Sequence, residues 1–144
     1  METGRLIKQI GHKLDSRMNE RLKEYDVTNS QFGVLIFLYK NRESDISQKC
    51  ICDFFNIKHT SLIDILKRLQ QKGLVEKKQN ESDSRQNTVF LSEKGFELCV
   101  QMEKGKQNAE ELILSDFSEE EKILLEKLLM KVKNNLDKGD DENG

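Results

Sequence analysis

Residues 58 to 72 carry the side chains of this sequence that are best placed to bind another molecule. Apolar residues recur there at helical spacing and predict a helix with one buried face: Leu62, Ile65, Leu66 and Leu69. The opposite face then presents Lys58, His59, Thr60, Ser61, Ile63, Asp64, Lys67 and Arg68. Polar and cationic groups on such a face suit base edges and phosphates in the major groove of DNA. An ordinary solvated helix face explains this stretch equally well when the helix is considered alone.

The residues that follow have the pattern of a β-hairpin. Gly73 stands just past the predicted helix end, and residues 74 to 77 and 88 to 91 have strand composition. A polar tip containing Arg85 lies between the strands. Helix, glycine and hairpin in this order argue against the solvated-face alternative and predict a winged helix-turn-helix over about residues 45 to 91.

The elements before residue 58 must position the predicted helix. Ser47 is placed to cap a short helix that ends near Phe55, and Asn56 suits the left-handed conformation that ends many helices. Ser47 and Lys72, at either side of the two helices, are candidate phosphate contacts. Upstream, Thr28 and Gln31 predict a capping box at the start of a core helix over residues 28 to 40.

The remaining chain is predicted to be helical, so the fold class is mainly α with a small β-hairpin. Apolar stripes predict a long first helix over residues 1 to 25, a connecting helix over residues 92 to 111 and a last helix over residues 112 to 137. Ser92 is a predicted cap, Ser118 and Glu121 form a second capping box, and the tail from 137 to 144 is expected to fray. At 144 residues we expect a single domain, with the winged lobe over residues 27 to 91.

Charge distribution separates the chain into basic and acidic parts. The net charge of −2 argues at first against a nucleic-acid partner, yet residues 58 to 80 contain six Lys or Arg against only Asp64 and Glu76. The acidic excess lies at the C-terminal end. No apolar run is long enough to span a membrane and no signal-peptide core is present, so a cytoplasmic location is expected.

Few residues of this sequence suit a metal or catalytic centre. Cys50 and Cys52 point to different faces of a helix, and structural roles are expected for them in preference to a metal site or thiol switch. Cys99 completes an odd number of thiols that we expect to be reduced, and His12 and His59 are the two histidines. No phosphate loop or nucleophile elbow occurs. We expect no enzyme activity, no metal and no cofactor.

Three segments resemble the MarR family of bacterial transcription regulators: residues 27 to 32, residues 46 to 75, and Asp83-Ser84-Arg85 leading to residues 89 to 95. The resemblance extends from about residue 5 to 136. It implies a homodimer in which the first and last helices of two subunits intertwine; the alternative is that these helices pack on their own winged lobe. It also implies that Arg85 reaches the minor groove, oriented by Asp83, with Lys77 and Lys78 in the same wing. Asn80, Glu81 and Ser82 replace the further basic residues that are common in the family.

The function expected from the residues and the resemblance is that of a sequence-specific transcription regulator. It would be a repressor that binds a pseudo-palindromic operator as a homodimer, with half-sites about one helical turn apart. A small-molecule effector, unidentified by the sequence, is implied by the family. The alternative is a protein-interaction adaptor that uses the winged fold and the acidic C-terminus.

Overall fold

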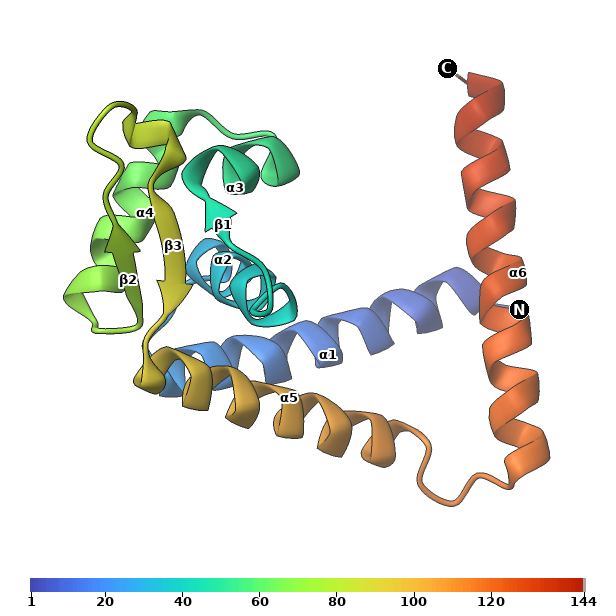
Figure 1. Ribbon diagram of the computed structural model, residues 1–144. Coiled ribbons are helices and arrows are strands. Elements are labelled where there is room, and N and C mark those ends of the chain that lie inside the picture. The colour runs from blue at the N-terminus through green and yellow to red at the C-terminus, as the bar shows by residue number, and fades with distance from the viewer. Residues whose placement is uncertain (144) are drawn as a thin grey trace. The chain divides into compact units, whose positions relative to one another are not determined.

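The computed structural model describes the backbone of residues 1–143 and the side chains of residues 1–141. The elements, in chain order, are α1 (Thr3–Glu24), α2 (Asn29–Lys40), β1 (Ile46–Ser47), α3 (Gln48–Phe55), α4 (His59–Gln71), β2 (Val75–Lys78), the 3-10 turn η1 (Ser84–Gln86), β3 (Thr88–Leu91), α5 (Glu93–Ile113) and α6 (Glu119–Asn143) (Figure 1). They form two compact units that divide within α5, residues 1 to 103 and the chain from Lys104 onward. The predicted single domain stays a prediction.

The core of the first unit lies among α2, α3, α4 and the sheet. Leu35 of α2, Ile51 of α3 and Leu66 of α4 are each 0% exposed. α2 contacts both α4 and β3, which explains why its sequence is apolar on nearly all sides. The C-terminal half of α1 joins this core through Leu22, whereas Leu6, Ile7, Ile10 and Leu14 nearer its start are exposed.

The sheet has three antiparallel strands in the order β1-β3-β2. The predicted hairpin is present as β2 and β3, with Val75 opposite Leu91 and Lys78 opposite Thr88. β1 was not predicted: Ile46 and Ser47 pair with Val89 and Thr88 on the other side of β3. This third strand ties the start of α3 to the hairpin.

The predicted helix ends of the first unit are confirmed in detail. Thr28 Oγ1 accepts from Gln31 N (3.2 Å), and Thr28 N donates to Gln31 Oε1 (3.3 Å), which completes the capping box. Ser47 Oγ accepts from Cys50 N (3.1 Å) at the start of α3. Asn56 (φ 52°) and Gly73 (φ 72°) adopt the left-handed conformation at the ends of α3 and α4. Each signal lies within a few residues of the helix end that it determines.

The helices of the second unit differ from their predicted bounds. α5 continues to Ile113 and α6 begins at Glu119, so the boundary predicted at residue 112 is wrong; the capping box of Ser118 and Glu121 is present. The tail predicted to fray is helical through Asn143, and residue 144 lies outside the described chain. Lys133 and Asp137 form an i,i+4 ion pair (3.3 Å) that favours this continuation. None of the described helices is long and apolar enough to cross a membrane.

Candidate nucleic-acid interface

α3 and α4 form a helix-turn-helix joined by Asn56, Ile57 and Lys58. The turn is closed by the left-handed Asn56 and by Ile57 N, which donates to Cys52 O (3.1 Å). Leu62, Leu66 and Leu69 on the inner face of α4 are all 0% exposed, so the helix is anchored along most of its length. An exposed face on a helix fixed in this way can enter a groove without rearranging.

The structure divides the predicted α4 contacts into two groups. Six of them are exposed: Lys58, Thr60, Ser61, Asp64, Lys67 and Arg68. His59 and Ile63 are half-buried, and His59 Nδ1 has no hydrogen-bond partner within the described chain. The expectation that Ile63 is an exposed aliphatic residue is therefore wrong, because its position borders the buried leucine face of α4. The exposed face is polar, with three cations against one carboxylate.

The tip of the wing is an ordered turn held by its own polar side chains. Asn80 Oδ1 accepts from Ser82 N (3.1 Å), Ser82 Oγ (2.8 Å) and Asp83 N (3.3 Å). Asn87 Oδ1 in turn accepts from Asn80 N (2.8 Å) across the base of the tip. Arg85 lies in η1 at this tip and is exposed. The cation is thus presented by a folded turn that brings it to the outside of the wing.

Asp83 contacts the backbone of Arg85, its neighbour in the wing. Its Oδ1 accepts a hydrogen bond from the backbone N–H of Arg85 (3.0 Å), so the carboxylate caps η1 and orients the backbone that carries Arg85. The two residues are neighbours as predicted, but the contact fixes the turn and not the side-chain rotamer.

The wing also docks on α3 through residues that the sequence interpretation missed. Gln48 N, at the start of α3, donates to Asn87 O (2.9 Å), and η1 contacts α3. Gln48 is 0% exposed and Asn87 7% exposed, which is unusual for residues of these types. Asn80 and Asn87 at the two ends of the polar tip are typical turn-forming residues and could have been recognised as such. The burial of Gln48 has no comparable local signal.

The two predicted phosphate contacts are both engaged within the protein. Ser47 Oγ caps α3 and also donates to Cys50 Sγ (3.2 Å). Lys72 Nζ donates to Asp26 O and to Gln31 Oε1 (2.8 Å), which ties the end of α4 to the start of α2. Lys77 is half-buried on β2, whereas Lys78 is exposed beside the tip. Lys72 therefore fits a structural role better than the predicted phosphate contact.

The three thiols have different surroundings. Cys99 is buried with its Sγ 3.6 Å from Leu35 O, and burial raises the pKa of its thiol to about 11. Burial also raises the pKa of the half-buried Cys52. Cys50 is exposed, and its hydrogen bonds with the Ser47 hydroxyl and backbone lower the pKa of its thiol. A structural role thus suits Cys52 and Cys99, whereas the exposed Cys50 lies outside the core and the structural role expected for it stays a prediction.

The Cys99 thiol should make the stability fall in alkaline solution. Its pKa is about 11 in the folded chain against 9.0 for an ordinary thiol, so the unfolded chain loses its proton first as the pH rises. The free energy of unfolding should then decrease by roughly 2 kcal/mol between about pH 9 and pH 11. Urea unfolding of the wild type and Cys99→Ala across this range isolates the effect. Parallel pH profiles for the two proteins would contradict this assignment.

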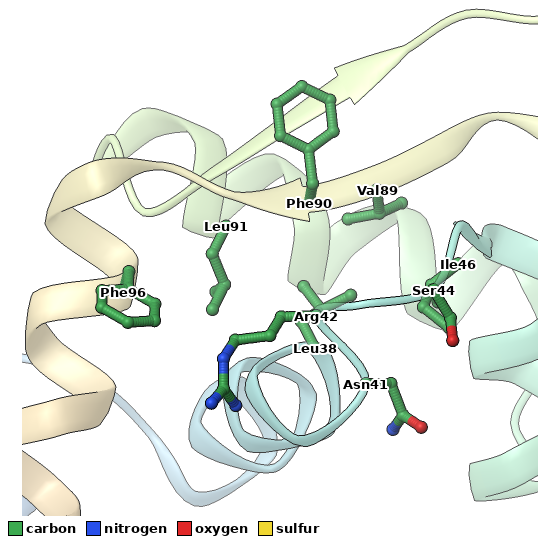
Figure 2. A pocket seen from close by; sticks show the side chains of 9 residues that line it. All are labelled: Leu38, Asn41, Arg42, Ser44, Ile46, Val89, Phe90, Leu91 and Phe96. Atoms are coloured by element: carbon green, nitrogen blue, oxygen red, sulfur yellow. The ribbon is translucent and has the colours of Figure 1, made fainter.

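A small pocket lies on the winged lobe away from these contacts (Figure 2). It has a volume of about 150 Å³ and is formed by the end of α2, β1, β3 and the first turn of α5. Its lining residues are Leu38, Asn41, Arg42, Ser44, Ile46, Val89, Phe90, Leu91 and Phe96. The guanidinium carbon of Arg42 lies 4.5 Å from the centroid of the Tyr39 ring, and the guanidinium donates to Tyr39 O (2.7 Å). None of the predicted DNA contacts lines this pocket, so the interface of α4 and the wing is a separate surface.

Comparison with known proteins supports the same architecture. The family model for the transcriptional regulator SarA/Rot matches residues 17–102. The multiple antibiotic resistance protein MarR of Escherichia coli is 31% identical over 130 residues, which are 90% of this chain and 89% of that protein. YybA, an HTH-type transcriptional regulator of Bacillus subtilis, is 28% identical over 134 residues, 93% of this chain and 88% of its own.

Two solved structures of MepR from Staphylococcus aureus have a similar fold. The MepR–DNA complex gives a TM-score of 0.82 at 23% identity and covers 92% of this chain and 98% of that one. MepR bound to ethidium bromide gives a TM-score of 0.79 at 23% identity and covers 94% and 97%. The mainly α fold with a winged helix-turn-helix is thereby confirmed.

Proposed function

This chain belongs to the SarA/Rot family of transcriptional regulators and is a relative of MarR, and on that basis we propose that it binds duplex DNA through α4 and the wing. The observation that carries the proposal is the pairing of a firmly anchored α4 with an exposed polar face. Leu62, Leu66 and Leu69 hold the helix, and Asp64, Lys67 and Arg68 lie on its outside. MepR, which shares the fold, has been solved in complex with DNA.

The exposed groups have distinct roles in this proposal. Thr60, Ser61 and Asp64 are suited to hydrogen bonds with base edges in the major groove. The cations Lys58, Lys67, Arg68 and Lys78 neutralise phosphates, while Arg85 enters the adjacent minor groove. The half-buried His59, Ile63 and Lys77 stand at the edges of this surface. Ser47 supports it by capping α3.

We propose further that two copies of the chain bind one operator. Apolar residues at the start of α1 and along α6 are exposed, and burial against a second copy would remove them from water. A dimer reads a pseudo-palindromic operator with half-sites about one helical turn apart. Bound over a promoter, the dimer represses by excluding polymerase. A small molecule would release it from DNA by binding more tightly to a dimer whose two winged lobes are spaced differently. The MepR structure with ethidium bromide supports a small-molecule effector.

Selection of bound sequences from a pool of random duplexes tests the proposal. A DNA-binding regulator should enrich a symmetric sequence, and its affinity should fall steeply with salt because Lys and Arg displace counterions. The alternative function, a protein-interaction adaptor, predicts no duplex binding even at low salt. Repeating the selection with candidate small molecules tests the effector.

Arg85→Ala should weaken binding to the selected duplex by at least about 1 kcal/mol and leave the fold intact. The side chain is exposed, and the turn is held by Asp83, Asn80 and Asn87, so its removal costs little stability. Titration at fixed salt measures the loss. Arg5→Ala, which removes an exposed cation from α1, is the matched control. Equal affinity of both variants would exclude the wing from the mechanism.

A further inference from the structure

Lys72 is the C-cap residue of α4, and its side chain reaches the start of α2, the core helix of the winged lobe. Its Nζ donates to Asp26 O and to Gln31 Oε1 (2.8 Å), partners that lie 46 and 41 residues earlier in the chain. Gln31 is only 4% exposed, and Lys72 itself is half-buried. Two of the three donors of the ammonium are thus occupied by the protein.

Both partners of Lys72 belong to helix ends. Gln31 Oε1 also accepts from Thr28 N (3.3 Å), so one amide oxygen serves the first turn of α2 and the end of α4. Asp26 has the left-handed conformation (φ 55°) that ends α1, and its N–H donates to Lys23 O (3.1 Å). The ammonium therefore joins the end of α4 to the α1–α2 junction.

The backbone around Lys72 is fixed on its other side by α5. Lys72 O accepts from Lys94 Nζ (3.0 Å), and Gly73 O accepts from Ser92 Oγ. Ser92 N donates to Leu74 O (3.1 Å), and Ser92 Oγ caps α5 by accepting from Gly95 N (3.0 Å). Residues 72 to 74 are thus the point where the end of α4 is held against α2 on one side and α5 on the other.

We infer that Lys72 is a positioning residue for DNA binding, which sets the orientation of α4 from its C-terminal end. This inference rests on the proposed function. The exposed groups of α4 must meet base edges within hydrogen-bond distance, so a small rotation of the helix misplaces all of them together. At the opposite end of α4, the N-cap Lys58 makes no side-chain capping hydrogen bond with the described residues. Lys72 acts through α4 and not through a phosphate.

The salt dependence of binding separates this role from a phosphate contact. Lys72→Met keeps the aliphatic stem and removes the donors, and should weaken binding to the selected duplex about fivefold or more. The slope of log affinity against log salt should stay as in the wild type. Lys67→Met, on the exposed face of α4, is the matched control and should reduce the magnitude of that slope by about 1. A slope reduced by about 1 in Lys72→Met would show a phosphate contact and overturn the inference.

Gln31 provides the second test, which also serves if Lys72→Met does not fold. Gln31→Leu removes the shared acceptor and should weaken binding as Lys72→Met does, and the double variant should lose little more than either single one. Gln31→Glu keeps an acceptor for both Lys72 and Thr28 N and should restore binding. Additive losses, or a Gln31→Glu variant as weak as Gln31→Leu, would overturn the inference.

A wild type that binds no duplex removes the proposed function itself, whereas a binding wild type with an unaffected Lys72→Met removes only the role of Lys72.

Discussion

A Gly95→Ala variant will lose about 3 kcal/mol or more of its free energy of unfolding. Gly95 is buried in the first turn of α5, and a Cβ placed on it would overlap the carbonyl oxygen of Leu74. That oxygen cannot move aside, because it belongs to the backbone at the start of β2 and accepts a hydrogen bond from Ser92 N (3.1 Å). Alanine therefore forces the start of α5 away from the end of α4.

The same substitution at Gly11 provides the control and should have the opposite sign. Gly11 lies within α1, and a Cβ there would meet nothing within 4 Å in the chain. Because alanine favours helix more than glycine, Gly11→Ala should stabilise the protein by about 0.5–1 kcal/mol. Urea unfolding of both variants and the wild type, at one protein concentration, measures the difference. A Gly95→Ala variant with the same urea midpoint of unfolding as the wild type would show that α5 does not approach Leu74 so closely.

The features that could be predicted from the sequence are those that neighbouring residues determine. Thr28 with Gln31, Ser47, Asn56 and Gly73 each act within one helical turn, so residue type and spacing suffice to locate them. β1 has only two residues, too few for any periodicity, and forms because β3 offers a free edge. The contact of Lys72 with Gln31 joins residues 41 apart, and no local pattern encodes it.

The candidate site shows the same division at the level of single side chains. Composition correctly placed Arg85 in a polar tip, since turn-forming residues surround it. Whether Asp83 binds a guanidinium or a backbone N–H depends on the conformation of the tip, which Asn80 and Asn87 determine jointly. Similarly, Ile63 is half-buried and Asp64 exposed because Ile63 borders the face of α4 that buries three leucines. Helical spacing alone predicts which residues face outward, but not which residues at the border of that face are half-buried.

The apolar residues of α6 lead to the second large prediction, which concerns assembly. Leu128 is 48% exposed, Leu129 51% and Leu136 67%, and their spacing places them on one side of a helix that is otherwise strongly charged. Leaving this many large side chains in water is unfavourable, at about 1.5–3 kcal/mol for each that burial would cover completely. A second copy of the chain can cover them.

Leu128→Glu should therefore raise the dissociation constant of the proposed homodimer by at least about 100-fold. The change removes the burial of a leucine and places an unpaired carboxylate in the contact, and these two costs add. Sedimentation equilibrium over a range of protein concentrations measures the constant.

Asn134→Glu introduces the same charge on α6 at a different angle around the helix and should leave the constant nearly unchanged. Equal dissociation constants for Leu128→Glu and Asn134→Glu would show that net charge, and not the apolar stripe, governs assembly. A monomeric wild type would exclude the dimer. A monomer retains one α4 and one wing, so the Leu128→Glu variant should bind a single half-site weakly and lose the added affinity of two linked contacts on a palindromic duplex.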